Sequence, residues 1–172
     1  LFAEGNKTGQ FAEYQSQYGL QVKIFHQLRS IGLTKIDHLK SLTALLMAIV
    51  ALGLTLTIWR DFSVRSAALH YVIFLLSPWI IAFSGNLYWI PFSWFLPLLC
   101  TSIFAPKIYT NIIYYFLLLI LLFLSFSFKF LSGYEYMSTI ILASFAPVVY
   151  HGLKVKNTCK AVVGFCGGIL LV

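Results

Sequence analysis

The sequence contains few charged residues. Lys and Arg number 12 and Asp and Glu only 5 among 172 residues, which is 10% charged against 60% hydrophobic. Soluble domains carry about 25% charged residues, so this chain has too few to cover a globular surface in water. The mean hydropathy of +0.87 agrees. The composition therefore excludes an ordinary soluble domain.

Acidic side chains are the scarcest, and none lies in the middle of a long apolar stretch. The five are Glu4, Glu13, Asp37, Asp61 and Glu135. A proton- or cation-coupled transport path needs ionisable groups at membrane depth, so we expect no such path in these residues. His70 is the exception among titratable groups, and we interpret it as a packed or interfacial histidine rather than a proton relay.

Motifs for metal binding and for common catalytic chemistry are also missing. Cys100, Cys159 and Cys166 form no C-x-x-C pair and have no histidine at ligand spacing, so we interpret them as small apolar groups and predict no metal site. The sequence contains no glycine-rich phosphate loop, no H-E-x-x-H and no G-x-S-x-G. We expect no nucleic-acid partner.

The charges that are present lie at intervals that match the thickness of a bilayer. Uncharged stretches of 19, 41, 21 and 18 residues separate Lys40 from Arg60, Arg65 from Lys107, Lys107 from Lys129, and Glu135 from Lys154. A helix needs about 20 apolar residues to cross about 30 Å of hydrocarbon. The gaps therefore fit one, two, one and one spans, with the lipid bilayer as the main partner.

We therefore predict an all-α fold, a polytopic transmembrane helical bundle, in residues 39–172. It has about five complete spans and a truncated sixth, near residues 41–59, 67–83, 89–104, 112–128, 137–150 and 161–172. The chain is expected to turn at 84–86 and at 105–107. Because the sequence begins with Leu and ends inside a 12-residue apolar run, we expect it to be a fragment of a larger membrane protein.

Residues 1–38 differ from the rest. A polar, glycine-containing opening is followed by a segment that puts four apolar side chains on one helical face: Leu20, Ile24, Leu28 and Ile31. We predict an extracytoplasmic loop and an amphipathic helix that lies in the membrane interface. The alternative is an amphipathic helix that covers another part of the same protein.

The distribution of Lys and Arg among the short loops predicts the orientation. One side receives Arg60, Arg65, Lys107, Lys154, Lys156 and Lys160, and the other only Lys129. This places the first group in the cytoplasm, and residues 1–38 and the turn at 84–86 outside. Counting the five basic residues before Ser41 makes the two sides equal, but we give the short loops more weight.

The stretch "GNLYWIPFSWFLP", residues 85–97, carries five aromatic rings and no charge. Tyr88 and Trp89 are expected at the membrane surface, where amphipathic rings are enriched. Pro91 and Pro97 are expected to distort the start of the next helix. The orientation puts this turn on the same side as the N-terminal loop, so the two could face one another across a site.

Two segments resemble a known class of proteins. "EYQSQYGLQVKIFHQL" and "SPWIIAFSGNLYWIPFSWFLP" resemble uncharacterised bacterial multi-spanning membrane proteins, some of which are similar to membrane glycosyltransferases of the GT-C type. The resemblance covers about a quarter of the chain, residues 12–28 and 77–97. It implies a bacterial plasma-membrane enzyme that moves a sugar from a polyprenyl-phosphate donor to an extracytoplasmic acceptor.

The resemblance implies roles for Glu13, Lys23 and Arg29, and the polar loop itself offers Tyr14 and Gln17. The class uses an acid, usually Asp, in its first outer loop, but residues 1–36 contain only Glu4 and Glu13. We expect the acid before Leu1, with Glu13 as a substitute base or an inactive protein as the alternatives. Lys23 and Arg29 would stabilise the leaving phosphate, with a divalent metal as a candidate cofactor. The side chains that could hydrogen-bond a polar ligand are Tyr14 and Gln17.

A non-enzymatic function is the alternative to sugar transfer. The chain would then be an assembly or transporter subunit whose helices pack against partners. The lack of charge inside the spans and the small residues of "VVGFCGG" favour such a structural role.

Overall fold

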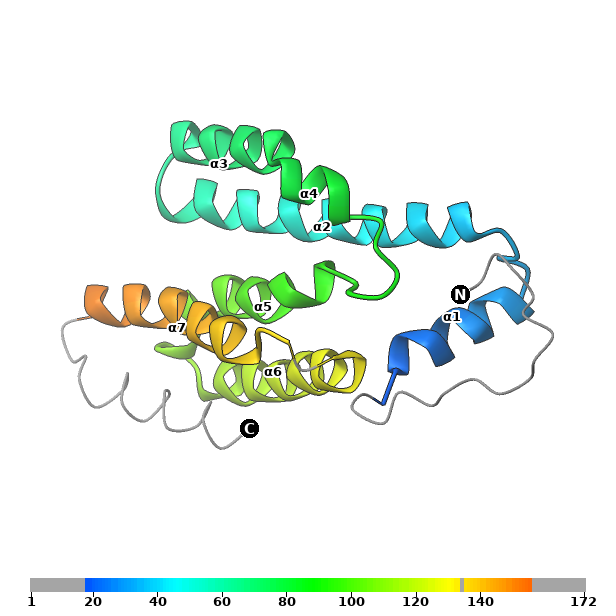
Figure 1. The fold of residues 1–172 in the computed structure, drawn as a ribbon. Helices are drawn as coiled ribbons and strands as arrows, with labels where there is room; N and C mark the ends of the chain where they lie inside the picture. Colours follow the sequence, from blue (N-terminus) through cyan, green and yellow to red (C-terminus); the bar gives the residue numbers. More distant parts are fainter. Residues whose placement is uncertain (1–17, 134, 156–172) are drawn as a thin grey trace.

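The computed structural model describes residues 18–133 and 135–155 of the protein (Figure 1). Within these residues it is all-helical, with seven helices and no strand, as the composition predicted. The helices are α1 (Leu20–Ser30), α2 (Ile36–Asp61), α3 (Val64–Leu76), α4 (Pro78–Phe83), α5 (Phe92–Ile108), α6 (Ile112–Ser132) and α7 (Met137–Lys154).

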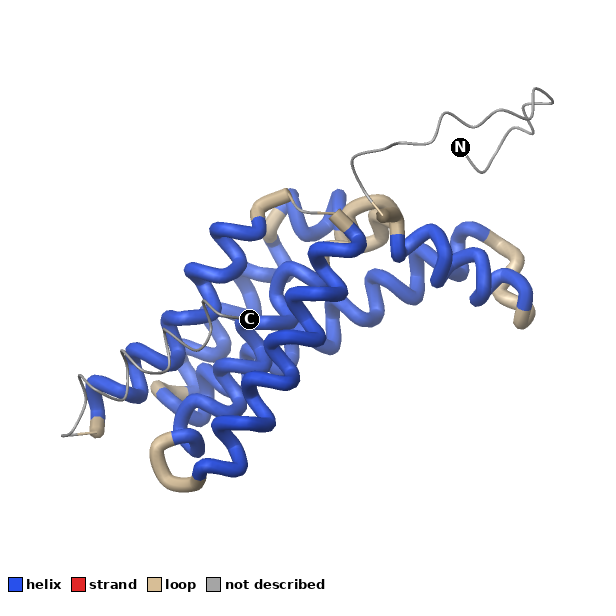
Figure 2. The backbone as a smooth tube through the Cα atoms, turned by 90° about the horizontal axis from the view of Figure 1, so that it is seen from below, coloured by secondary structure: helices blue, strands red, loops and turns tan. Residues whose placement is uncertain are grey.

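The helices from α2 onward run back and forth along one direction. The chain reverses after α2, α4, α5 and α6 (Figure 1), and most of the helices lie alongside one another (Figure 2). Helix α5 is central, because it contacts α2, α6 and α7. We call the end with the last turns of α2, α5 and α7 the Asp61 end, and the opposite end, with the α4–α5 turn, the aromatic end.

Each predicted span that falls within the described residues is helical. Two helices, α2 and α6, are long and apolar enough to cross a membrane, and α3 and α5 are shorter apolar helices. The predicted sixth span at 161–172 lies outside the described residues. Helix α5 begins at Phe92 rather than 89, because residues 84–91 form the turn.

The predicted span at 67–83 is two helices, not one. Pro78 has no N–H, and its ring pushes the preceding residue out of helical conformation, so Ser77 is extended with ψ 115°. Pro78 then occupies the first position of α4, where its missing donor costs nothing. The Ser77 hydroxyl accepts a hydrogen bond from the N–H of Ile80 at 3.4 Å. The break therefore follows from the proline, which the sequence interpretation had placed inside a continuous helix.

The turn at 84–86 is confirmed, and Asn86 organises it. Its side-chain oxygen accepts hydrogen bonds from the N–H groups of Tyr88 and Trp89, both at 2.9 Å. By contrast, the turn expected at 105–107 is wrong. Pro106 lies inside α5, and the chain turns only after Ile108.

Four rings of the aromatic end pack in a closed circuit. Trp79 contacts Phe83 and Trp94, with ring centroids 5.5 and 5.2 Å apart, and Trp89 contacts the same two rings at 5.0 and 6.3 Å. The circuit joins α4 to the start of α5. Tyr88 points outward instead, with 49% of its surface exposed. The location of these rings at a membrane surface stays a prediction, but their packing closes this end of the bundle.

Helix α1 packs on the aromatic end. Its buried Phe25 joins Leu39 and Ile90 in a small hydrophobic cluster, and the Gln21 side chain donates to the carbonyl of Tyr88 at 3.2 Å. These contacts favour the alternative in which α1 covers part of the same protein. Ile31 was expected on its apolar face but is 78% exposed, because the helix ends at Ser30.

The close approach of α2 and α5 depends on Gly53. A Cβ atom at this position would lie 2.8 Å from a methyl carbon of Leu99. We expect Gly53→Leu to overpack this contact and lower the free energy of unfolding by about 1–3 kcal/mol. Reversible unfolding of the purified protein in mixed detergent measures the change.

The control is Ala48→Leu, which adds the same side chain at an exposed position of α2. Adding Leu99→Ala to Gly53→Leu should recover part of the loss, because it makes room for the new side chain. Equal destabilisation by Ala48→Leu would contradict the close approach.

Candidate functional site

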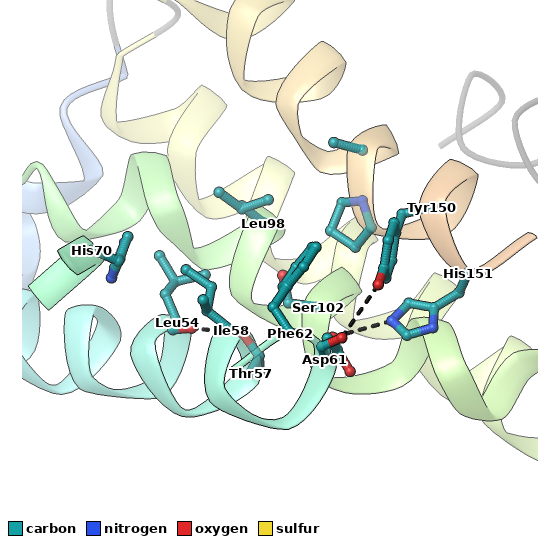
Figure 3. Close-up of a pocket in the computed structure, with 12 residues that line it drawn as sticks. Leu54, Thr57, Ile58, Asp61, Phe62, His70, Leu98, Ser102, Tyr150 and His151 are labelled. Atoms are coloured by element: carbon teal, nitrogen blue, oxygen red, sulfur yellow. Dashed lines mark hydrogen bonds and ion pairs between the residues drawn. The ribbon is translucent and has the colours of Figure 1, made fainter. Parts of the chain in front are cut away.

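A cavity of about 340 Å³ lies between α2, α3, α5 and α7 (Figure 3). Its lining comprises Leu54, Thr57, Ile58, Asp61, Phe62, His70, Leu98, Ser102, Ala146, Pro147, Tyr150 and His151. The first four recur at the helical spacing i, i+3, i+4, i+7, so a single face of α2 forms one wall. Leu54 and Ile58 are the apolar members of this wall, Thr57 lies between them, and Asp61 lies at its end.

Asp61 and His151 form a hydrogen-bonded pair at one end of the pocket. The His151 Nε2 atom lies 3.1 Å from a carboxylate oxygen of Asp61 (Figure 3). The Tyr150 hydroxyl donates to the backbone carbonyl of Asp61 at 3.2 Å. Only 12% of the Asp61 side chain and 10% of the His151 side chain are exposed. The last turn of α2 is thereby joined to α7.

Arg60 joins the same carboxylate to α5. Its guanidinium donates to both carboxylate oxygens of Asp61, at 2.7 and 2.8 Å, and to the carbonyl of Ser102 at 2.6 Å. That carbonyl needs a donor from outside its helix, because its usual partner would be the N–H that Pro106 does not have. Arg60 therefore compensates for the proline inside α5 and neutralises the charge of Asp61.

His70 lies at the opposite end of the pocket from His151 (Figure 3). Its Nδ1 atom is 3.0 Å from the Thr55 hydroxyl, and Thr55 donates to the carbonyl of Ala51 at 2.8 Å. The sequence left open a packed or an interfacial histidine, and His70 is half-buried against α2. The sequence did not predict that it lines a pocket.

These groups can bind a polar atom and hold a proton beside an apolar wall. Aspartate paired with histidine is an arrangement that orients an imidazole for proton transfer. No three His, Cys, Asp or Glu side chains gather into a metal-binding group within the described part of the chain. The geometry there points to binding through hydrogen bonds.

Lys129 is a second buried charge, at the aromatic end. Only 2% of its side chain is exposed, and it donates to the carbonyl of Gly133. The carboxylate of Glu135 lies 3.8 Å away, and the Trp94 ring centroid lies 5.7 Å from the Lys129 Nζ atom. The sequence interpretation counted Lys129 only as a loop charge. Its spacing of 7 and 11 residues from the buried Leu122 and Leu118 was the signal that it belongs to the inner face of α6.

The two glycosyltransferase candidates in the described part of the chain do not line this pocket. Lys23 and Arg29 are exposed on α1, and the Lys23 Nζ atom lies 3.7 Å from the centre of the Tyr18 ring. Neither lines the pocket. Three further candidates lie outside the described residues: Glu13, Tyr14 and Gln17.

Removing the charge of Asp61 tests whether this cluster holds the helices together. We expect Asp61→Asn to lower the free energy of unfolding by about 1–3 kcal/mol, because charge-assisted hydrogen bonds from Arg60 and His151 are weakened. Asp37→Asn changes an exposed acid in the first turn of the same helix and serves as the control. If both variants lose the same stability, the cluster contributes no more than a surface charge.

Known protein families, curated proteins and solved structures were compared with the chain, and none of the three comparisons gave a match. What the protein does must therefore be inferred from its residues and their geometry.

Proposed function

We propose that the chain is an integral membrane protein of five passes, formed by α2, α3 with α4, α5, α6 and α7, which binds a small membrane-soluble molecule in the pocket at Asp61. The observation that carries this proposal is an inverted distribution of polarity: the outer surface of the helices is largely apolar, and many of the buried side chains are polar.

Helix α6 illustrates the inversion. Its buried face ends in Ser125, Lys129 and Ser132, whereas its exposed face consists of large apolar side chains: Ile112, Ile113, Phe116, Leu117, Ile120, Phe123 and Leu124. A helix at the surface of a water-soluble protein has the opposite pattern, with its apolar stripe towards the core. The pattern supports hydrocarbon rather than water as the surrounding solvent.

The other long helices also bury small polar side chains and expose apolar ones. Thr43, Thr57, Thr101 and Ser144 are buried, and each donates its hydroxyl hydrogen to a carbonyl of its own helix. Such small polar residues are typical of contacts between membrane helices, where they allow close packing without an unsatisfied donor. Outward from α2 point Leu45, Ile49, Leu52 and Leu56.

The charges also fit a membrane orientation. Arg60, Arg65, Lys107 and Lys154 all belong to the Asp61 end, in the last turns of α2, α5 and α7 or the first turn of α3. With the basic residues before Ser41 set aside, as in the count over short loops, this grouping supports a cytoplasmic location for that end. The aromatic end, with α1, would then be extracytoplasmic.

The pocket supports ligand binding within such a bundle. Its volume of about 340 Å³ falls at the lower end of the range for small-molecule sites, roughly 300–1,000 Å³. A mostly apolar wall with a few convergent polar groups is the usual composition of such sites. A ligand with an apolar body would lie along α2, with its polar group at the Asp61–His151 pair.

Transfer of a sugar from a lipid-phosphate donor is the second candidate. The observation that favours it is the hydrogen bond from Gln21 to the carbonyl of Tyr88, which joins the helix after the N-terminal loop to the aromatic turn. Exposed Lys23 and Arg29 on that helix are available to a phosphate. Such a site would lie at the aromatic end, far along the bundle from Asp61.

Thiol labelling tests the proposed topology. Single cysteines replace Arg65 and Thr110 at the Asp61 end and Lys40 and Ser138 at the aromatic end, after the three native cysteines are changed to Ser. In sealed vesicles of uniform orientation, a membrane-impermeant maleimide should label the two members of each pair from the same side, and the two pairs from opposite sides. Labelling of all four from one side would contradict five passes.

Turnover of a lipid-linked sugar tests the second candidate. In membranes that contain the protein, Glu13→Gln should reduce turnover at least tenfold if this carboxylate is the base. Lys23→Gln and Arg29→Gln should weaken donor binding and raise KM. His26→Gln, an exposed change on the same helix, is the control. Unchanged turnover in Glu13→Gln would remove Glu13 from the mechanism.

A further inference from the structure

Two of the three hydroxyl groups that line the pocket already use their hydrogen atoms within the protein. Thr57 donates to the carbonyl of Leu54 at 2.8 Å, and Tyr150 donates to the carbonyl of Asp61 at 3.2 Å. A hydroxyl has one hydrogen and two lone pairs. Each of these oxygens can therefore only accept a further hydrogen bond.

The hydrogen bonds of Thr55 favour one tautomer of His70. With its hydroxyl hydrogen directed to the carbonyl of Ala51 at 2.8 Å, the Thr55 oxygen is placed to accept from the His70 Nδ1–H at 3.0 Å. A neutral imidazole that carries its hydrogen on Nδ1 has a lone pair on Nε2. At this end of the pocket, too, the group left for a ligand is an acceptor.

At the Asp61 end of the pocket the groups left for a ligand are again acceptors, and the charge of the carboxylate is balanced. The carboxylate of Asp61 can only accept, and it does so from Arg60 and from His151. The guanidinium of Arg60 balances its negative charge at 2.7 Å. The hydroxyl of Ser102 also lines the pocket, and it can pair with a donor or an acceptor.

We infer that the ligand is a neutral apolar molecule that donates a hydrogen bond, such as an alcohol or a phenol. This inference rests on the proposed ligand-binding function and names the chemical class that the same pocket accepts. A carboxylate ligand can only accept hydrogen bonds, so it would not pair with the acceptor atoms of the pocket. An ammonium ligand would lose its hydration on entry, and no unpaired negative charge would compensate for that loss, because Arg60 already pairs with Asp61.

The spacing of the two polar ends limits the size of the apolar body. Thr55, which holds His70, and Asp61 are six residues apart on α2, which is about 9 Å along the helix axis. One ring or a short chain, with a hydrogen bond of about 3 Å at an end, fits this length. Leu54 and Ile58 form the wall between the ends.

Four probes on one benzyl frame test the ligand class. The full chain is reconstituted in nanodiscs, and benzyl alcohol, toluene, benzylamine and benzoate are measured by equilibrium dialysis against empty nanodiscs. Benzyl alcohol should bind about fivefold or more tighter than toluene, the difference that one ordinary hydrogen bond makes. Benzylamine and benzoate should bind more weakly than the alcohol.

Two variants assign the binding to this pocket. Ala146→Trp should fill the pocket and abolish the excess binding of every probe, whereas Leu142→Trp, one turn earlier on α7 and 71% exposed, should leave it unchanged. Tyr150→Phe removes one acceptor oxygen. It should reduce the preference for benzyl alcohol over toluene while leaving toluene binding in place.

The outcomes separate this inference from the proposed function. Tightest binding of benzoate or benzylamine, lost in Ala146→Trp, would overturn the assignment of a neutral donor but keep the pocket as a ligand site. Tightest binding of toluene, lost in Ala146→Trp, would do the same. Absence of any binding that depends on Ala146 would overturn the ligand-binding function itself.

Discussion

Arg60 donates hydrogen bonds to the carboxylate of Asp61 and to the carbonyl of Ser102, and these bonds join α2 to the centre of the bundle. Pro106 leaves that carbonyl without its helical donor, and Arg60 supplies one. The same carboxylate accepts from His151, so α7 is joined as well. An unpaired carbonyl or charge in an apolar surrounding costs free energy, and each group in this cluster provides a hydrogen-bond partner for another.

The pocket lies between the cluster at the helix ends and the close contact of α2 with α5. Near the middle of α2, Gly53 allows α5 to approach closely through Leu99. Towards the Asp61 end, the face of α2 between that contact and the cluster borders the cavity instead. At the opposite end Lys129 has an equivalent role: its buried ammonium group pairs with Glu135, between α6 and α7. Charged groups therefore join the helices at both ends of the bundle, and apolar side chains pack between the two ends.

The helices could be predicted from the sequence because the spacing of charges reflects the length of an apolar helix. The site could not be predicted, because Asp61 and His151 are 90 residues apart and belong to no local motif. The turn predicted at Pro106 was wrong for the same reason. The helix continues past Pro106 because Arg60 donates to the carbonyl of Ser102, and these two residues are 42 positions apart in the sequence. Pro78, by contrast, breaks its helix because Ser77 provides a cap for a new one. A neighbouring cap therefore decides the effect of Pro78, and a tertiary contact decides that of Pro106.

For the proposed membrane protein, the surrounding solvent decides what would drive the proposed ligand into the pocket. A molecule dissolved in hydrocarbon gains little by moving its apolar body from lipid to the wall formed by Leu54 and Ile58, because both are equally apolar. Its hydroxyl group, however, has no acceptor in the hydrocarbon and finds several at Asp61, Tyr150 and His70. Binding from the membrane is then driven by hydrogen bonding rather than by hydrophobic burial. The neutral balance of Arg60 and Asp61 favours the same ligand, because an uncharged donor pays no cost of charge desolvation on entry.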